Sequence, residues 1–202
     1  MADDLRYGRV ADFYDLLDLP FEYLRYRPLR RRLFEGVHGA VLDAGCGTGR
    51  NIPFYPAGAD VVGIDLSPRM LARARRRAGR LGARVELREA DARDTGLAEA
   101  RFDFVIASFL FCVLREEDQL PALAELRRVT KPTGEIRLLD YTWSQQPVRR
   151  FVMRLWAPWV RRLYGASFGH EPQRHAVAAG LRLAEDRYLY SDMIRMLVLR
   201  PA

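Results

Sequence analysis

Residues 41–51 read VLDAGCGTGRN, an apolar run that leads directly into three glycines within five positions. Glycine permits positive φ angles and lets another molecule approach the backbone closely. The spacing is G-x-G-x-G, which differs from the G-x-G-x-x-G of dinucleotide folds, and no Lys-Ser or Lys-Thr pair follows as in a P-loop. We predict a strand over residues 40–44, a helix over residues 49–55, and a ligand site at the sharp turn between them.

On either side of this turn, short apolar segments alternate with helical patterns. We expect strands at residues 40–44, 61–65, 84–88, 102–107 and 135–140, and further helices at residues 68–81 and 116–130. Strands that alternate with helices indicate a mostly parallel sheet covered on both faces, the Rossmann-like class of α/β fold. Residues 181–190 and 193–200 leave no space for a helix between them, so they predict an antiparallel pair at one edge.

The length of 202 residues fits one domain, with residues 1–35 as a helical N-terminal cap and residues 144–165 as a helical insert. Hydrophobic residues make up 49% and charged residues 29%, as in ordinary globular proteins. No apolar run approaches the roughly 20 residues that span a bilayer. Cys46 and Cys112 form no C-x-x-C pair, and the histidines have no metal-like spacing, so we expect a cytoplasmic chain without disulfides or metal.

The charge balance is basic, with 33 Lys and Arg against 26 Asp and Glu and a net charge of +7. Lys131 is the single lysine, so the positive charge comes almost entirely from arginine. The arginines cluster over residues 25–32, 69–80 and 149–162. This clustering indicates attraction to an anionic partner.

Acidic residues follow the second and third expected strands. Asp65 ends the second strand, where a carboxylate can accept hydrogen bonds from both hydroxyls of a ribose. Ser67 and Pro68 then form the signature of a helix cap and first helical residue. Asp91, in EADA after the third strand, lies at the same edge of the expected sheet.

Together, VLDAGCGTGRN, Asp65 in VVGIDLS and Asp91 resemble the three cofactor motifs of the class I S-adenosylmethionine-dependent methyltransferases. The resemblance covers roughly residues 36–140 and implies S-adenosyl-L-methionine as cofactor and S-adenosyl-L-homocysteine as product. The residues that it assigns to cofactor binding are Tyr7, Asp43, Gly45, Cys46, Gly47, Thr48, Gly49, Asn51, Asp65, Leu66, Met70, Asp91, Ala92, Ser108 and Phe109.

The same resemblance implies a role for several of these positions. The three glycines line the methionine part, Asp65 holds the ribose, and Asp91 with Ala92 meets the adenine. Ser108 and Phe109 face the sulfonium, and Asp43 orients either the loop or the amino group of the cofactor. Met70, Cys46 and Cys112 also suit simple packing.

The residues expected on the acceptor side of the site are mostly apolar. After the fourth expected strand the chain has ASFLFCVL, without the [N/D]-P-P-aromatic stretch with which nucleic-acid amino-methyltransferases hold a base. The N-terminal YGRVADFYDLL resembles the entry segment of quinone methyltransferases and of small bacterial phospholipid N-methyltransferases. That resemblance places Tyr7 or Tyr14 near the methyl group, although Tyr14 also fits a core position.

Residues 148–165 combine an apolar stripe with a basic one. Arg149, Arg150, Arg154, Arg161 and Arg162 lie opposite the apolar residues, and Pro158 is expected to kink or split the helix. The apolar residues recur at helical spacing: Val148, Phe151, Val152, Leu155, Trp156, Trp159, Val160, Leu163 and Tyr164. Such a helix suits an anionic membrane interface, or alternatively a core-facing position with solvated arginines. Residues 21–33 give weaker support of the same kind.

Along most of its length the chain resembles the soluble bacterial phosphatidylethanolamine N-methyltransferases, including RLLDYTWS after the fifth expected strand. The resemblance implies stepwise methylation of phosphatidylethanolamine toward phosphatidylcholine on the inner face of the cell membrane. Candidates for accepting the amine proton are Tyr14, Tyr141, His170 or a water held by Asp140. We expect a monomer.

Other acceptors and one other class of function stay open at this point. A quinone C-methyltransferase and an S- or N-methyltransferase of an apolar small molecule are the enzyme alternatives. A cofactor-binding regulator or nucleic-acid binder is the non-enzymatic one, and we expect no nucleic-acid partner.

Overall fold

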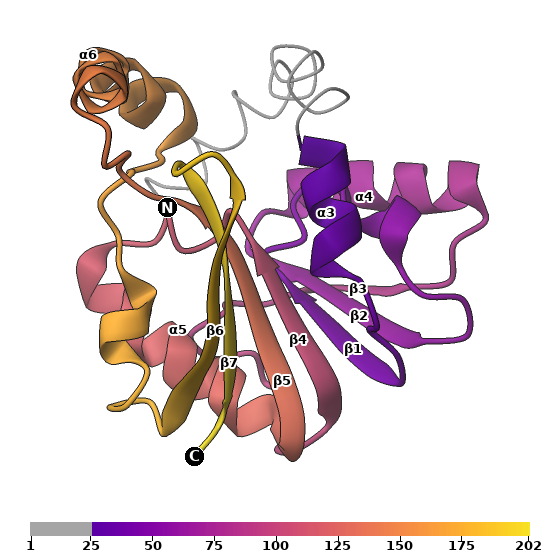
Figure 1. Cartoon of the computed structure of the whole chain (residues 1–202). Coiled ribbons are helices and arrows are strands. Elements are labelled where there is room, and N and C mark those ends of the chain that lie inside the picture. Colours follow the sequence, from indigo (N-terminus) through magenta and orange to yellow (C-terminus); the bar gives the residue numbers. More distant parts are fainter. Residues whose placement is uncertain (1–25) are drawn as a thin grey trace.

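The computed structural model describes residues 26–202, except for the side chains of Leu163 and Tyr164, and is built on one seven-stranded sheet (Figure 1). The strand order is β3-β2-β1-β4-β5-β7-β6. The strands are β1 (Ala40–Ala44), β2 (Asp60–Asp65), β3 (Glu86–Glu89), β4 (Phe102–Ser108), β5 (Thr130–Tyr141), β6 (Leu181–Tyr190) and β7 (Ile194–Pro201). Neighbours among β1 to β5 are parallel, and β7 is antiparallel to both β5 and β6. The predicted fold class, including the antiparallel pair at one edge, is confirmed.

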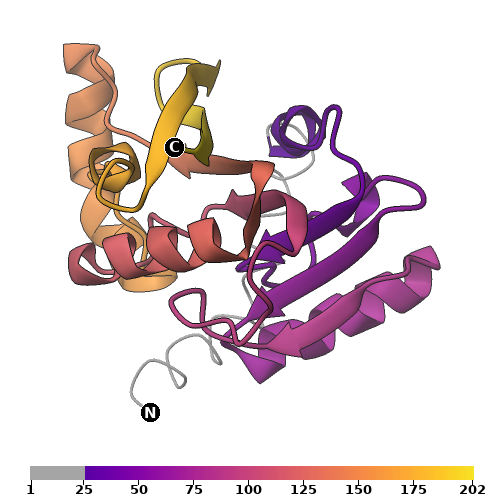
Figure 2. The same cartoon turned by 90° about the horizontal axis from the view of Figure 1, so that it is seen from below.

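Helices cover both faces of this sheet. Those that pack against the sheet are α3 (Arg27–Leu33), α4 (Pro68–Leu81) and α5 (Glu116–Val129). The other helical elements are α6 (Pro147–Tyr164) and the 3-10 helices η2 (Ile52–Phe54) and η3 (Pro172–His175). Leu29 and Leu33 of α3 pack in one cluster with Val41, and Leu123 of α5 packs in another with Leu42. Because successive strand residues point to opposite faces, α3 and α5 lie on opposite sides of the sheet, as Figures 1 and 2 show.

The boundaries of α4 follow directly from local chemistry. The Met70 backbone N–H donates to Ser67 Oγ at 3.4 Å, Pro68 occupies the first helical position, and Gly82 ends the helix at a φ of +61°. The predicted helix over residues 68–81 and its cap are confirmed.

Other boundaries differ from the predictions. The helix expected over residues 49–55 is wrong, because only the 3-10 turn η2 forms there. Pro56 biases Tyr55 toward an extended conformation, and Tyr55 has φ −60° and ψ 134°. The strand expected at 84–88 spans Glu86–Glu89, and β5 begins five residues earlier than expected, with a register shift opposite Phe102 and Phe104. At Gly134 a Cβ would come within 3.0 Å of the Phe102 carbonyl oxygen, so only glycine allows the strands to approach so closely there.

The insert between β5 and β6 forms α6, which runs unbroken through Pro158. In Figure 1 it stands beyond the edge at which the parallel strands end. Asp192, in the β6–β7 turn, fixes its first turn: Oδ2 accepts from the Ser144 hydroxyl at 2.7 Å and from the Gln145 backbone N–H at 2.8 Å, and Oδ1 accepts from Arg149. Among the described residues, no helix is both long and apolar enough to cross a membrane.

Candidate functional site

The three glycines of the β1 turn have positive φ angles, but each has a different spatial role. A Cβ on Gly45 would meet Leu110 Cδ1 at 2.9 Å, and a Cβ on Gly49 would meet Ile52 Cδ1 at 2.5 Å and Ala74 Cα at 3.1 Å. A Cβ on Gly47 would meet nothing within 4 Å, at a φ of +55°. Gly45 and Gly49 therefore serve close packing, and Gly47 is the glycine with open space for a ligand.

Asp65 lies beside this open position at the end of β2. Its Oδ2 accepts from the Gly47 backbone N–H and its Oδ1 from the Ser67 backbone N–H, each at 2.9 Å. Burial raises the pKa of Asp65, and the two backbone N–H groups partly offset that rise. Each oxygen accepts one backbone hydrogen bond and keeps capacity for another, so the carboxylate can still accept from a diol.

Behind the turn lies a buried polar network centred on Asp43 and Asn51. Asn51 Nδ2 donates to both oxygens of Asp43, at 2.9 and 3.0 Å, and the Tyr55 hydroxyl donates to Asp43 at 2.6 Å. Burial raises the pKa of Asp43 to about 6, against the opposing effect of these hydrogen bonds. Because its hydrogen bonds join β1 to the segment that follows the glycines, Asp43 orients the loop in this structure.

Arg30 connects α3 to the same hydrogen-bond network. Its Nη1 donates to Asn51 Oδ1 at 2.7 Å and to Ser108 Oγ at 3.0 Å, and its guanidinium lies 5.4 Å from the centre of the Phe109 ring. Helix α3 is thus hydrogen-bonded to Asn51, which follows the glycine turn, and to Ser108 at the end of β4. Arg30 was not predictable as a site residue because it stands in a run of arginines, and Tyr55 was not predictable because no sequence pattern singles it out.

The remaining positions expected at the cofactor surround the ends of β1, β2 and β3. Leu66 is 60% exposed, whereas Cys46, Thr48, Met70 and Ala92 are buried. Asp91 forms a forked ion pair with Arg93, which also binds Asp118, and the hydrogen bonds from Arg93 lower the pKa of Asp91. The Asp91 carboxylate therefore already has a cationic partner in this structure.

Aromatic rings gather at the ends of β4 and β5. The Phe109 ring lies 4.8 Å from that of Tyr141 and 5.4 Å from that of Tyr26, and the Tyr141 hydroxyl donates to the Tyr26 hydroxyl at 2.9 Å. Phe168 packs 5.6 Å from Tyr141 and 5.3 Å from Trp143. All five rings are half-buried, so they form a partly open apolar wall, which we call the aromatic cluster: Tyr26, Phe109, Tyr141, Trp143 and Phe168. No sequence pattern singled out Phe168, whereas Trp143 lies in the RLLDYTWS segment and Tyr26 in residues 21–33, although neither was predicted as a site residue.

Asp140 and His170 occupy different places near this wall. Burial raises the pKa of Asp140 to about 6, while its oxygens accept the backbone N–H groups of Cys112 and Tyr141, each at 2.9 Å. His170 Nδ1 lies 3.1 Å from Glu116, which also contacts His175. Asp140 thus holds the chain around Tyr141, and His170 is bonded to the start of α5. Tyr7 and Tyr14 lie outside the described residues.

This arrangement can hold a nucleoside on one side and an apolar acceptor on the other. S-adenosylmethionine fits the open backbone at Gly47, the diol-accepting carboxylate of Asp65 and the exposed apolar side chain of Leu66. The aromatic cluster begins at Phe109, the first residue after β4, whose φ of +56° turns the chain sharply. Aromatic faces stabilise neighbouring cations, which suits a sulfonium and an ammonium acceptor.

Comparisons with known proteins identify methyltransferases among the similar sequences. The family described as a methyltransferase domain matches residues 41–134. A phosphatidylethanolamine N-methyltransferase of Cereibacter sphaeroides is 38% identical over 55% of this chain and 57% of its own length, so the match spans little more than half of that relative. A demethylmenaquinone methyltransferase of Thermus thermophilus is 32% identical over 81% of this chain and 78% of its own length.

A solved structure shows the same fold over nearly the whole chain. The crystal structure of an S-adenosylmethionine-dependent methyltransferase from Aquifex aeolicus superimposes with a TM-score of 0.67 at 20% identity. It covers 96% of this chain and 97% of its own.

Proposed function

The chain belongs to the class I S-adenosylmethionine-dependent methyltransferases, and from that premise we propose that it methylates the amine of phosphatidylethanolamine, stepwise toward phosphatidylcholine. S-adenosylmethionine is the methyl donor. The lipid stays in the membrane, and the enzyme binds reversibly to the inner surface of the cell membrane through α6. The Cereibacter sphaeroides relative, whose name gives the same acceptor, supports this choice.

The observation that carries the membrane part of the proposal is the exposed apolar face of α6. Trp156 and Trp159 are 63% and 62% exposed, and Met153 is the sole buried side chain among those described in the helix. The exposed apolar side chains are Val148, Phe151, Val152, Leu155, Trp156 and Trp159. This exposure argues against the alternative of a core-facing helix, because that arrangement buries the apolar stripe.

The charge of α6 suits an anionic leaflet. Arg149 is bound to Asp192, so Arg150, Arg154, Arg161 and Arg162 supply the charge that faces outward. At roughly 1 kcal/mol each near an anionic surface, they contribute about 4 kcal/mol at most. Insertion of the two tryptophans adds to this, which suffices for reversible docking.

The chemistry asks the chain mainly to position the reactants and to exclude water. The cofactor supplies an activated methyl group. The aromatic cluster holds the acceptor, and its ring faces stabilise the ammonium product. Orientation of bound reactants contributes up to about 7 to 11 kcal/mol of rate enhancement. Asp140 acts as a positioning residue through the backbone of Tyr141.

A quinone C-methyltransferase is the second candidate. The Thermus thermophilus relative, named as a demethylmenaquinone methyltransferase, aligns with 81% of this chain against 55% for the lipid enzyme. A quinone also partitions into membranes, so α6 alone does not separate the two acceptors.

Methyl transfer to defined vesicles tests the choice. The protein is incubated with methyl-labelled cofactor and vesicles of phosphatidylglycerol that contain either phosphatidylethanolamine or a demethylated quinone, and the lipids are separated by chromatography. We expect label in mono-, di- and trimethylated phosphatidylethanolamine. Label in the quinone fraction alone would replace the proposal with the second candidate, and label in neither would reject both.

A further inference from the structure

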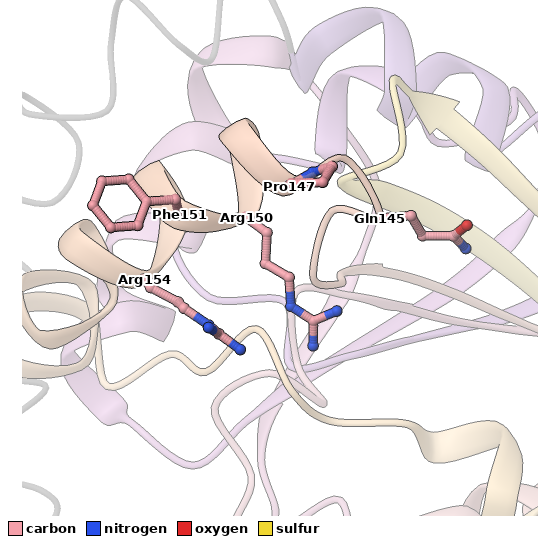
Figure 3. Close-up of a pocket in the computed structure, with 5 residues that line it drawn as sticks. All are labelled: Gln145, Pro147, Arg150, Phe151 and Arg154. Atoms are coloured by element: carbon pink, nitrogen blue, oxygen red, sulfur yellow. The ribbon is translucent and has the colours of Figure 1, made fainter.

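An open cavity of about 580 Å³ lies against the first half of α6 (Figure 3). It is lined by side chains of α6 and of the segment before it: Gln145, Pro147, Arg150, Phe151 and Arg154. We call it the α6 recess. Arg150 and Arg154 are four residues apart and extend from the same side of the helix, and Phe151 projects from another side (Figure 3). The recess therefore brings two guanidinium groups together beside an exposed aromatic ring.

Among the residues that the structure describes, these two guanidinium groups have no acidic partner. Across residues 26–202, neither Arg150 nor Arg154 forms an ion pair or a side-chain hydrogen bond, whereas Arg149 on the same helix is bound to Asp192 and Ser191. Two neighbouring cations without an acid repel each other, and a bound anion relieves that repulsion. Guanidinium forks match the oxygens of a phosphate group, with which they form paired hydrogen bonds.

The surroundings of the recess favour a phosphate that is carried by a lipid. Phe151 on its rim is 62% exposed and belongs to the apolar stripe of α6, which continues through Leu155, Trp156 and Trp159 on the side of the helix away from the two arginines. A free phosphate ion gains nothing from such a face, whereas a phospholipid offers acyl chains directly beside its phosphate. We propose that the α6 recess binds the phosphodiester group of a membrane phospholipid while the apolar face of α6 contacts the acyl region.

The recess is also connected to the reacting edge of the sheet. Gln145 lies four residues after Tyr141 of the aromatic cluster, so their Cα atoms are separated by at most about 14 Å. The Gln145 amide can donate to a further phosphate oxygen. That the bound lipid is the acceptor itself rests on the proposed function, but binding of a phosphodiester does not.

Vesicle binding of two charge-matched variants tests the recess. Arg150→Gln with Arg154→Gln removes the two recess arginines, and Arg161→Gln with Arg162→Gln removes the same charge from the other end of α6. All four side chains are exposed, so both variants should melt at the temperature of the parent protein. Vesicles of neutral phosphatidylcholine carry phosphodiester groups but no net surface charge. Binding to them therefore reports direct contacts with phosphate and not the long-range attraction of a basic protein to an anionic membrane.

On phosphatidylcholine vesicles we expect the recess variant to bind about tenfold more weakly and the control variant to bind within about twofold of the parent. Equal losses in the two variants would show that only general charge matters and would overturn the proposal. Inorganic phosphate is added as a competitor against chloride at the same ionic strength. Guanidinium groups that bind a phosphodiester also bind inorganic phosphate, so phosphate should displace the parent protein more strongly than chloride does. Equal displacement by the two salts would overturn the proposal.

These results are independent of the acceptor assay. Failure to methylate phosphatidylethanolamine rejects the proposed function, whereas the difference between the two variants on vesicles tests the recess alone.

Discussion

At the scale of single residues, two glycines of the β1 turn have different expected roles, Gly49 in packing and Gly47 in ligand binding. Gly47 and Gly49 both have positive φ angles, so alanine at either position costs roughly 1 to 2 kcal/mol of backbone strain. At Gly49 the new Cβ also overlaps Ile52 and Ala74, whereas at Gly47 it enters open space. We therefore expect alanine at Gly47 to weaken mainly ligand binding and alanine at Gly49 to lower mainly the stability of the fold.

For Gly47→Ala we expect a fold that is destabilised only by the backbone strain and an affinity for S-adenosylhomocysteine reduced about tenfold or more. For Gly49→Ala we expect a further loss of about 1 to 3 kcal/mol of stability from overpacking. Urea unfolding and titration calorimetry measure the two effects. Unchanged cofactor affinity in Gly47→Ala would contradict the assignment of this open space to the ligand.

Tyr141 gives a second prediction at this scale, because its ring and its hydroxyl have different partners. The ring faces Phe109 and Phe168, and the hydroxyl donates to Tyr26. If the ring face holds the ammonium group, Tyr141→Phe should keep kcat within about threefold, and Tyr141→Ala should lose up to about 30-fold. Steady-state methylation rates decide this. A loss in Tyr141→Phe as large as in Tyr141→Ala would instead make the hydroxyl the acting group.

The sequence was sufficient to predict those residues whose position follows from the end of a strand. Asp65 and the glycines could be placed because the strand pattern defines where the turn falls. Arg30 could not be identified among its neighbouring arginines, since its role depends on Ser108, which lies 78 positions away. The contact between Phe168 and Tyr141 was equally unpredictable, because it forms only when segments that are distant in the sequence pack together.

At the scale of elements, α6 depends on a single carboxylate for its attachment. Asp192 accepts from Ser144 and from the backbone at Gln145 and Gln146, and these contacts, with Arg149, lower its pKa. A negative charge at a helix N-terminus also interacts favourably with the helix dipole. The helix contributes little buried apolar surface, so this anchor carries much of its orientation.

We therefore expect Asp192→Ala to accelerate amide hydrogen exchange in the first two turns of α6 with little change in the melting temperature. Glu185→Ala, which removes an exposed acid of β6, serves as the control. Exchange measured by mass spectrometry reports the difference. Protection of α6 equal to that of the parent protein would mean that other contacts hold the helix.

In addition to its buried apolar face, helix α5 is held by a polar contact of Glu125, and this contact predicts a pH dependence. Burial alone would raise the pKa of Glu125, but hydrogen bonds from Arg128 and Thr95 outweigh it and lower the pKa to about 2. Because the pKa is below that of the unfolded chain, the stabilisation is present above about pH 4.5 and is lost as the pH falls toward 2. The shift corresponds to about 3 kcal/mol at neutral pH.

Glu125→Gln should thus be less stable than the parent by about 3 kcal/mol at pH 7, and the difference should shrink by pH 3. Urea unfolding at the two pH values measures it. Glu117→Gln, at an exposed position of the same helix, should show little difference at either. If the free energy of unfolding of Glu125→Gln is lower than that of the parent by the same amount at both pH values, lost packing and not lost charge causes the effect.

The element boundaries show where sequence patterns are informative and where they are not. The bounds of α4 were predictable because Ser67, Pro68 and Gly82 act locally. The helix expected at residues 49–55 does not form because Pro53 lies within it and Pro56 follows it, and proline removes a backbone donor and restricts the residue before it. The early start of β5 depends on the close approach of Gly134 to β4, a contact between segments that no local pattern reveals.

At the scale of the whole molecule, we expect the two substrates to bind at different parts of the sheet edge. The expected cofactor site lies at the ends of β1, β2 and β3, and α6 follows β5 on the other side of β4. Among the described contacts, the network of Arg30, Asn51 and Asp43 reaches β4 at Ser108, and none links α6 to β1 or β2. Loss of membrane binding should therefore leave cofactor binding intact.

Trp156→Ala with Trp159→Ala tests this separation. Both side chains are exposed, so their removal leaves no core cavity and should not shift the melting temperature. Burial of a large apolar side chain contributes roughly 1.5 to 3 kcal/mol, so binding to anionic vesicles should weaken by at least about tenfold. Leu81→Ala, at an exposed position at the end of α4, is the control and should bind vesicles like the parent.

The same double variant distinguishes docking from catalysis. With a soluble short-chain phosphatidylethanolamine, which needs no membrane, kcat should stay within about twofold of the parent, whereas the KM for the vesicle-embedded lipid should rise with the loss of binding. Titration calorimetry should give an unchanged Kd for S-adenosylhomocysteine. A fall in kcat on the soluble lipid would place the tryptophans in the acceptor site, and α6 would then act as its wall and not as a membrane anchor.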